Sequence, residues 1–294
     1  MTLEQLRIFV AVAEQEHMTR AAEMLHLTQS ATSAAIAALE LRHAVRLFDR
    51  IGRNIKLTSA GKLFLAEARA VLARSSAAEA VLSDLAGLKR GYLTLAASQT
   101  VGNYWLPRLI QHYCSLYPGI ALDLKIGNTE QVASWLMDSR ADLGFAEGKV
   151  DEPVLSARVV AEDELVLVVG ASHPWAGKRA PKLNELKAFE WIAREQGSGT
   201  RKVFEMALAG LGLKKSDIRI ALELPSNESV RGAVIAGAGA TILSKLVAEN
   251  TLKSGALAAL KIPLPSRSFF LLRHKERHET RAEQEFVKLI GTNK

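Results

Sequence analysis

The chain has 294 residues, of which 48% are hydrophobic, and it carries a formal net charge of +7. This much apolar material is enough for two or three cores and excludes a disordered protein. A lone cysteine, Cys114, excludes an internal disulfide, and no stretch has the pattern of a signal peptide or of a membrane span. We expect a soluble, cytoplasmic protein that has no membrane partner.

The first part of the chain, residues 1–57, predicts three short helices. The first helix shows apolar side chains at helical spacing, namely Leu6, Phe9, Val10 and Ala13. Thr19 can cap a second helix, and Thr28 can cap a third helix that runs to about Ala44, with Ala31, Ala35, Ile36 and Leu39 as its buried stripe. Only two or three residues remain between the second and third helices, which is helix-turn-helix spacing.

A small two-stranded wing is predicted next, over residues 47–58. Phe48, Ile55 and Leu57 alternate with polar residues, and Gly52 and Asn54 suit the tip of a hairpin. Residues 42–62 contain six basic side chains and one acidic side chain. The positive charge is therefore concentrated around the third helix and the wing, as a nucleic-acid-binding surface requires.

A long helix is predicted from Thr58 to about Gly87, within a linker at residues 58–90. At about 1.5 Å per residue it would be roughly 40 Å long. Its apolar seam has heptad spacing and consists of Phe64, Ala68, Val71, Ser75, Ala78, Leu82 and Leu85. The seam can pair with a second copy of the chain, or it can pack against its own domain.

Residues 91–294 alternate between strands and helices, which predicts an α/β domain with two lobes. Lobe I is expected at about 91–163 and 266–294, and lobe II at about 164–265. There is no sequence repeat and no low-complexity tract.

At this point the chain resembles the LysR-type transcriptional regulators. The stretches that carry the resemblance are "LRIFVAVAEQEHMTRAAEMLHLTQSATSAAIAALE", "LFDR" and "LTSAG". The resemblance implies a winged helix-turn-helix, a linker helix that forms homodimers, and a two-lobed effector domain resembling periplasmic binding proteins. It also implies a homotetramer, with RNA polymerase as a further candidate partner. The motifs "ASQTVGNYWLP", "IGNTEQV", "GFAEG" and "REQGSGTR" are similar to those of regulators of sulfur assimilation and carbon fixation.

The polar start of the third helix suits the recognition of promoter DNA. A recognition helix meets base edges and phosphates with its N-terminal turns, where amide and hydroxyl side chains make useful contacts. The alternative is a solvated polar face with wing arginines in surface ion pairs. We predict DNA contacts from Thr28, Gln29, Ser30, Thr32, Ser33, Arg50 and Arg53.

Several helices of the two-lobed domain are expected to begin near a shared cleft. Backbone N–H groups and hydroxyls at helix starts can bind an anion, although each residue alone can equally be an ordinary helix cap. Arg201 can add a charge or pair with Glu195 or Glu205, and Glu147 can hold a hydroxyl, a cation or a partner in the other lobe. The predicted effector-binding residues are Ser98, Gln99, Thr100, Asn128, Thr129, Glu147, Ser198, Thr200, Arg201 and Asn227.

These donors predict a small, oxygen-rich, anionic effector. The resemblance makes sulfite or sulfate the first candidate and a small carboxylate or phosphorylated metabolite the second. No catalytic motif, metal-ligand spacing or cofactor fingerprint is present, so we expect no enzyme activity, no metal and no cofactor. A solute-binding protein or an enzyme built on two such lobes is the alternative, and it would not bind promoter DNA.

Overall fold

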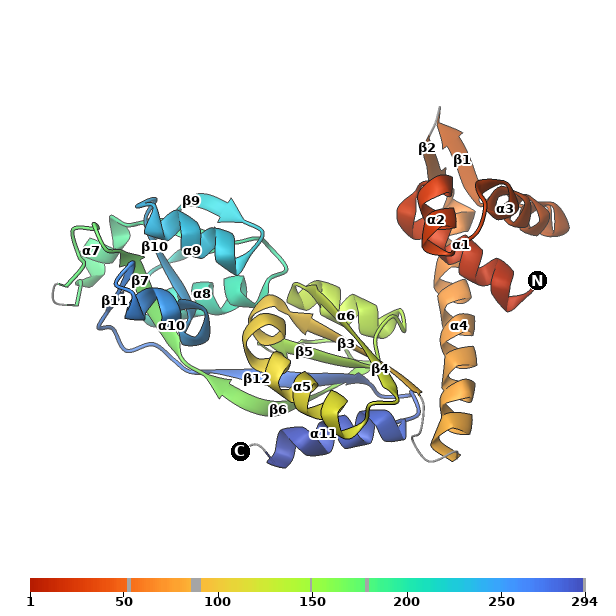
Figure 1. Ribbon diagram of the computed structural model, residues 1–294. Helices are drawn as coiled ribbons and strands as arrows, with labels where there is room; N and C mark the ends of the chain where they lie inside the picture. Colours follow the sequence, from red (N-terminus) through yellow and green to blue (C-terminus); the bar gives the residue numbers. More distant parts are fainter. Residues whose placement is uncertain (52–53, 86–90, 149, 178–179, 293–294) are drawn as a thin grey trace. The chain divides into compact units, whose positions relative to one another are not determined.

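The computed structural model describes residues 1–51, 54–85, 91–148, 150–177 and 180–292 (Figure 1). The chain divides into two compact units. One consists of Met1–Gly87 with Asp138–Arg140, and the other of Leu88–Met137 with Ala141–Lys294.

The first unit begins with three helices, α1 (Leu3–Gln15), α2 (Met18–Met24) and α3 (Gln29–His43). Thr2 and Gln5 form a capping box at the start of α1, and Thr28 caps α3 as predicted. His17, and not Thr19, caps α2 by accepting a hydrogen bond from the backbone N–H of Arg20. The predicted wing is an antiparallel hairpin of β1 (Phe48–Ile51) and β2 (Asn54–Leu57).

The long helix α4 (Ser59–Leu85) shares a core with these elements. The Phe9 ring of α1 lies 4.8 Å from the Phe64 ring and 5.4 Å from the Phe48 ring, and Ala68 is buried beside them. The first turns of α4 therefore belong to the same hydrophobic core as the helix-turn-helix, because their apolar side chains pack on α1.

Lobe I of the second unit is built on a five-stranded sheet of order β4-β3-β5-β12-β6. Its strands are β3 (Gly91–Ser98), β4 (Ile120–Gly127), β5 (Leu143–Glu147), β6 (Leu155–Asp163) and β12 (Arg267–His274). One face of this sheet packs against α5 (Leu106–Leu116) and α11 (Arg281–Thr292), and the other packs against α6 (Thr129–Met137) (Figure 1). A π-helix, η1 (Val101–Trp105), precedes α5.

Lobe II is built on a second sheet of order β11-β7-β10-β8-β9. Its strands are β7 (Leu165–Gly170), β8 (Glu190–Arg194), β9 (Arg219–Leu224), β10 (Ala240–Ser244) and β11 (Leu257–Leu260). The helices are α7 (Leu183–Lys187), α8 (Gly199–Gly210), η2 (Lys215–Asp217), α9 (Asn227–Ile235) and α10 (Lys245–Lys253). Side chains of α7 and α8 cover one face of this sheet, and those of α9 and α10 cover the other.

The sequence patterns did not predict β6, α7, α10 or β11. In β6 four consecutive residues, 156–159, are exposed, so the strand lacks the alternation by which a half-buried strand is recognised. Within the described ranges, no helix has the length and apolar character needed to cross a membrane.

Candidate functional site

The N-terminal turn of α3 presents polar side chains to solvent. The Thr28 hydroxyl accepts a hydrogen bond from the Ala31 backbone N–H at 3.2 Å and lies 3.1 Å from the Ser30 hydroxyl. Gln29 and Ser30 are exposed, and Ser33 is half-buried. Hydroxyl and amide groups at the positive end of a helix are the groups that contact base edges and phosphates.

Thr32 does not belong to this exposed face. Its side chain is fully buried, and its hydroxyl donates to the Thr28 carbonyl at 3.1 Å. Thr32 packs on the same side of α3 as Ile36 and Leu39, whereas Ala31, expected in the buried stripe, is exposed. The Thr32 hydroxyl is therefore used inside the fold, and the contact between Thr32 and DNA stays a prediction.

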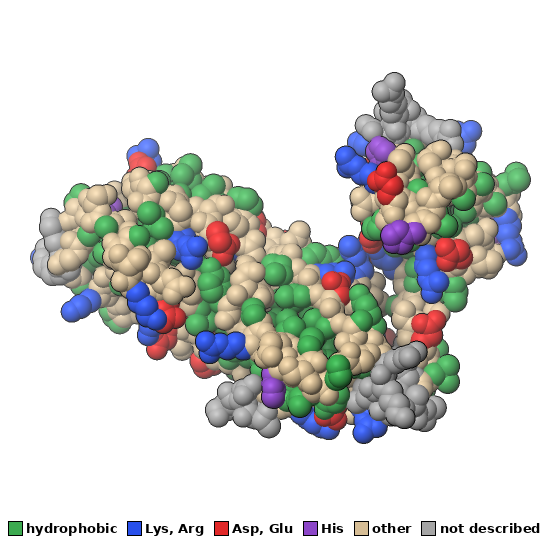
Figure 2. Space-filling view, in the orientation of Figure 1, with side chains coloured by type: hydrophobic (Ala, Val, Ile, Leu, Met, Phe, Trp, Pro, Cys, Tyr) green, Lys and Arg blue, Asp and Glu red, His purple; other side chains and the backbone are tan. Residues whose placement is uncertain are grey.

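The wing follows α3 and is anchored by apolar side chains on one face. Phe48 of β1 and Ile55 of β2 are buried in the core of the unit. Arg50 is in β1, where its backbone pairs with that of Ile55, and Arg53 lies outside the described residues. Figure 2 shows Lys and Arg side chains on the surface of this unit, in agreement with the excess of basic residues at 42–62.

The seam of α4 is divided between two environments. Phe64 and Ala68 pack into the core of their own unit, which was one of the two predicted roles of the seam. Farther along, Val71 is 42% exposed and Leu82 is 68% exposed. The part of the seam that is open to a second chain therefore begins after Ala68.

The interlobe site is centred on the buried carboxylate of Glu147, at the end of β5. The Ser98 and Thr100 hydroxyls of lobe I donate to it, Thr100 at 3.4 Å, and the Thr200 hydroxyl of lobe II donates to it at 2.8 Å. Glu147 is 1% exposed, and the three hydroxyl residues are also buried. Donors from the two lobes thus meet on one anionic group.

A buried ion pair lies next to Glu147. The Arg267 Nε donates to Asp163 Oδ2 at 2.6 Å, and the Arg267 guanidinium is 3.8 Å from Glu147. The Ser244 hydroxyl donates to the other Asp163 oxygen at 2.7 Å. Burial raises the pKa of Asp163, the Arg267 charge and the Ser244 hydrogen bond act against this rise, and Glu147 adds to it. Two carboxylates facing one guanidinium leave this cluster with one excess negative charge when both are ionised.

The start of α8 approaches Glu147 so closely that only glycine fits. A Cβ on Gly199 would lie 2.3 Å from the Glu147 carbonyl oxygen and 2.5 Å from the Thr129 hydroxyl. The Gly199 backbone N–H donates to that Thr129 hydroxyl at 3.1 Å. The "GSGT" segment therefore brings the N-terminus of a lobe II helix against the end of β5 in lobe I.

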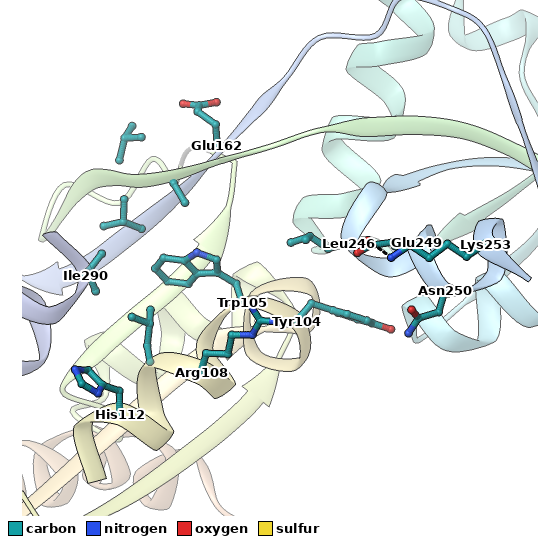
Figure 3. Close-up of a pocket in the computed structure, with 14 residues that line it drawn as sticks. Tyr104, Trp105, Arg108, His112, Glu162, Leu246, Glu249, Asn250, Lys253 and Ile290 are labelled. Atoms are coloured by element: carbon teal, nitrogen blue, oxygen red, sulfur yellow. Dashed lines mark hydrogen bonds and ion pairs between the residues drawn. The ribbon is translucent and has the colours of Figure 1, made fainter. Parts of the chain in front are cut away.

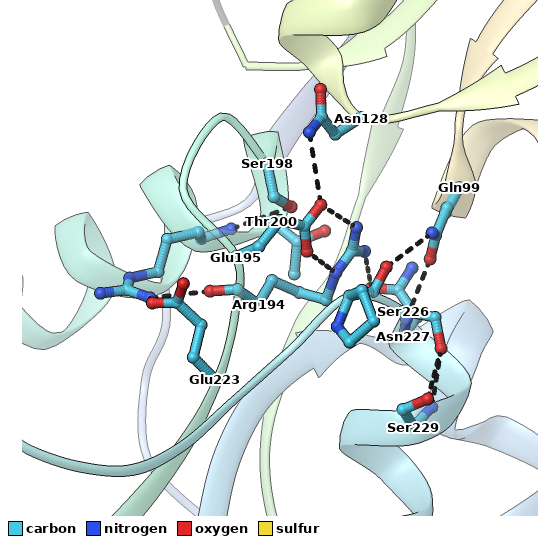
Figure 4. Close-up of polar contacts among 12 residues, drawn as sticks. Gln99, Asn128, Arg194, Glu195, Ser198, Thr200, Glu223, Ser226, Asn227 and Ser229 are labelled. Atoms are coloured by element: carbon cyan, nitrogen blue, oxygen red, sulfur yellow. Dashed lines mark hydrogen bonds and ion pairs between the residues drawn. The ribbon is translucent and has the colours of Figure 1, made fainter. Parts of the chain in front are cut away.

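A second group of polar contacts joins the lobes at the start of α9 (Figure 4). Asn227 is fully buried; its amide donates to the Thr100 hydroxyl at 3.0 Å, and its side-chain oxygen accepts from Arg194 at 2.7 Å. The Gln99 side-chain oxygen accepts from the Asn227 backbone N–H, and its amide donates to the Pro225 carbonyl, both at 3.0 Å. Gln99 and Asn227 therefore connect the end of β3 to lobe II.

The remaining predicted effector residues cap helices or form ion pairs, and the Asn128 amide also donates to Glu195 of lobe II at 3.4 Å (Figure 4). Asn128 caps α6 by accepting from the Gln131 N–H at 2.9 Å, and Ser198 caps α8 by accepting from the Arg201 N–H. The Arg201 guanidinium binds Glu205 at 2.6 Å and Glu223 at 2.8 Å, so it neutralises carboxylates of its own lobe. These ion pairs give Arg201 a structural role, and its contact with an effector stays a prediction.

Sequence reasoning missed Arg267, Asp163 and Arg194. Arg194 is 3% exposed and forms a two-point ion pair with Glu195, with distances of 2.7 and 2.8 Å. Arg267 opens a strand whose centre, residues 269–272, is apolar, and Asp163 follows a segment with several exposed residues. A charged residue at the edge of an apolar run is the only signal that marks either of them. No group of residues suited to hold a metal ion occurs in the described part of the chain.

Comparison with known proteins decides the family. Residues 3–62 match the model described as "Bacterial regulatory helix-turn-helix protein, lysR family", and residues 86–293 match the "LysR substrate binding domain". The chain belongs to the LysR family of transcriptional regulators. As a LysR-family protein it is a DNA-binding regulator with an effector-binding domain, and not an enzyme.

Relatives of this LysR-family regulator match along nearly the whole chain. "Uncharacterized HTH-type transcriptional regulator YeiE" of Escherichia coli K12 is 36% identical over 290 residues, covering 98% of this chain and 96% of the relative. A "Probable RuBisCO transcriptional regulator" of Cyanophora paradoxa is 33% identical, covering 99% and 91%. "HTH-type transcriptional regulator CysL" of Bacillus subtilis is 30% identical, covering 100% and 98%.

Solved structures agree with the two-unit, two-lobe architecture. The LysR family regulator CbnR has a TM-score of 0.73 at 24% identity, with 99% of each chain covered. The regulatory domain of CcmR from Synechocystis PCC6803, solved in complex with 2-PG, has a TM-score of 0.62 at 30% identity and covers 70% of this chain and 98% of that one. The predicted fold class, a helix-turn-helix followed by a two-lobed α/β effector domain, is confirmed.

Proposed function

We propose that this regulator recognises promoter DNA with the start of α3 and the wing, and that a small oxyanion between the two lobes controls it. The observation that carries the effector proposal is the convergence of the Ser98, Thr100 and Thr200 hydroxyls on one carboxylate. Hydroxyl donors from both lobes around a two-oxygen anionic group are the arrangement that an oxyanion needs.

The Glu147 carboxylate already accepts the hydrogen bonds of these three hydroxyls, and this limits how an effector can bind. When Asp163 and Glu147 are both ionised, the cluster with Arg267 has one excess negative charge, so an incoming anion has to displace the Glu147 carboxylate or bind together with a proton. Sulfite or sulfate is the first candidate and a small carboxylate or phosphorylated metabolite is the second. The relative solved with 2-PG supports a small effector in this domain.

A thermal-shift experiment tests the effector site. Sulfite, sulfate, phosphate and small carboxylates are titrated against wild type, against Thr100→Val combined with Thr200→Val, and against the control Ser115→Ala, which lies on the exposed face of α5. A ligand of the folded domain adds about 2.7 kcal/mol of stability at a hundred times its dissociation constant. We expect this stabilisation in wild type and control and its loss in the double variant.

Glu147→Gln separates charge from shape in the same assay. Glutamine keeps an oxygen acceptor for the hydroxyls but removes the like charge, so the variant should bind the anion at least about tenfold more tightly. Stabilisation only by aromatic or cationic compounds would contradict the proposal, and so would anion binding that survives the double substitution.

The proposed assembly is a homodimer through α4 and a tetramer through further contacts. It rests on the exposed apolar side chains Val71 and Leu82, which share the seam with buried Ala68. RNA polymerase stays a candidate partner, to be tested by co-purification on promoter DNA.

A further inference from the structure

Tyr104 of lobe I packs on the hydrophobic core of lobe II. It lies in the π-helix η1, and its side chain contacts a cluster of buried lobe II residues that includes Val230 of α9 and Val247 of α10. The next residue, Trp105, packs instead on the core of its own lobe. Because consecutive residues of a helix point in different directions, η1 can place Trp105 in lobe I and Tyr104 against lobe II.

Leu246 makes the reciprocal contact. It lies in α10 of lobe II and is half-buried against the lobe I core cluster that contains Phe145 and Phe269. Figure 3 shows Tyr104 extending from η1 toward lobe II, and Leu246 on α10 facing lobe I. Each lobe thus shields one apolar side chain of the other from water, and this burial is lost when the lobes separate.

Hydrogen bonds hold the Tyr104 ring in this position. Its hydroxyl donates to Glu228 Oε1 of α9 at 2.9 Å and accepts from the Arg231 guanidinium at 3.4 Å. Arg231 also donates to the Val247 carbonyl of α10 at 3.0 Å, so the tyrosine hydroxyl is linked to both helices on this face of lobe II. Burial and the Glu228 hydrogen bond raise the pKa of Tyr104, so the hydroxyl keeps the proton that it donates.

We infer that Tyr104 and Leu246 form a clasp that holds the two lobes closed. They are positioning residues, and neither is among the residues predicted to bind the effector. Their link to an effector rests on the proposed function, because closure brings Thr200 of lobe II to the carboxylate that Ser98 and Thr100 of lobe I already contact. The clasp therefore favours the arrangement in which donors from both lobes meet.

Two backbone amides report whether the lobes are closed. The Glu130 N–H of lobe I donates to the Gly197 carbonyl of lobe II at 3.3 Å, and the Gly199 N–H of lobe II donates to the Thr129 hydroxyl of lobe I at 3.1 Å. Both hydrogen bonds cross between the lobes, so the exchange of these amides with deuterated solvent follows the opening of the lobes.

Hydrogen exchange measured by mass spectrometry tests the clasp in the full-length protein without an added effector. Tyr104→Ala and Leu246→Ala should each speed exchange in the peptides that contain Glu130 and Gly199 roughly tenfold, because each removes a partly buried apolar side chain. Tyr104→Phe keeps the ring and should speed this exchange about twofold to tenfold, which is the effect of one lost hydrogen bond. Exchange in β3 and β8 should stay unchanged, because these strands pair inside their own sheets.

Matched controls are Tyr92→Phe and Leu116→Ala, which change an exposed tyrosine of β3 and an exposed leucine of α5. Both should exchange as the wild type does. The inference is overturned if Tyr104→Ala and Leu246→Ala leave exchange at Glu130 and Gly199 unchanged. It is also overturned if exchange rises equally in β3 and β8, because the variants would then only destabilise the whole domain.

Sulfite titrated in the thermal-shift assay separates the clasp from the effector proposal. If the wild type binds sulfite, Tyr104→Ala should weaken that binding about tenfold, and unchanged affinity would contradict the clasp. If no anion binds the wild type while the exchange results are as expected, the clasp is supported and the effector proposal alone fails.

Discussion

Removing Arg267 should expose the energetic role of the buried cluster between the lobes. Arg267→Gln keeps hydrogen-bonding capacity but leaves Asp163 and Glu147 as two buried carboxylates without their cation. The lost contacts are the 2.6 Å ion pair with Asp163, the 3.8 Å approach to Glu147, and hydrogen bonds to the Thr100 and Thr200 hydroxyls at 3.3 and 3.4 Å.

The expected cost is about 3–5 kcal/mol of unfolding free energy. This is the usual cost of removing one partner from a buried ion pair, and it agrees with the interaction of about 4 kcal/mol between unit charges 4 Å apart at an effective dielectric constant of about 20. Asp163→Asn in the same chain removes the charge that Arg267 neutralises. The double variant should therefore be less destabilised than the sum of the single variants, by up to about 3 kcal/mol.

Urea unfolding followed by tryptophan fluorescence measures these costs in the full-length protein. The four tryptophans, Trp105, Trp135, Trp175 and Trp191, all belong to the two-lobed unit, so the signal reports on that unit alone. The measurement should also be repeated at pH 5. Burial already raises the pKa of Asp163, and loss of Arg267 raises it further, so the folded variant takes up a proton that the unfolded chain does not.

The stability lost by Arg267→Gln should therefore shrink as the pH falls from 7 to 5. Additive costs within about 0.5 kcal/mol, or a loss that grows at pH 5, would refute this account of the cluster.

Three further predictions concern other parts of the molecule. Gln29→Ala should weaken operator binding by about 1–3 kcal/mol and relax the preference at one base position. Thr32→Val, in contrast, should mainly lower the stability of the helix-turn-helix. If gel-shift titrations give Gln29→Ala and wild type the same operator affinity, Gln29 is not a base contact. Val71→Asp should break the dimer, because it places an unpaired charge in the seam, and an unchanged mass in light scattering would count against α4 as the interface. Burial, the largest cause, and the Asp142 charge raise the pKa of Glu283 to about 7, so the folded domain binds a proton that the unfolded chain releases near pH 4.5. The contribution of Glu283 to the free energy of unfolding should decline by about 3 kcal/mol as the pH rises from 4.5 to 7. Glu283→Gln should flatten this pH dependence in urea unfolding. Identical pH profiles of the variant and the wild type would disprove the prediction.

Local signals in the sequence accounted for most of the helix-turn-helix. The cap at Thr28, the short turn before it and the alternation around Ile55 are decided by residues within a few positions of one another. The sequence alone did not show that Thr32 is buried, because a hydroxyl at a helix start can bind DNA or its own backbone. Only the packing of α3 on its neighbours decides between the two.

The interlobe site was predicted only where its residues end strands or start helices. Ser98, Thr100, Glu147 and Thr200 follow that rule, and the structure brings them together. Arg267 and Asp163 are 104 positions apart in the sequence, so neither residue could be assigned to the site without knowing that the fold pairs it with the other. The sequence also could not separate the π-helix η1 from α5, because both continue one helical pattern.

The Asp163 to Arg267 ion pair has a mechanical consequence. The chain crosses between the lobes directly after β6, which ends at Asp163, and again before β12, which begins at Arg267. The ion pair therefore ties the two crossings to each other, so any relative rotation of the lobes that keeps this pair has to turn about a point near it. Displacement in a rotation grows with distance from the axis. In sheet order, β4 is the strand farthest from β6 in lobe I, and β9 is the strand farthest from β7 at the edge reached through β10 and β8. A rotation of the lobes that keeps the ion pair would therefore move β4 and β9 farther than it moves the atoms around Glu147.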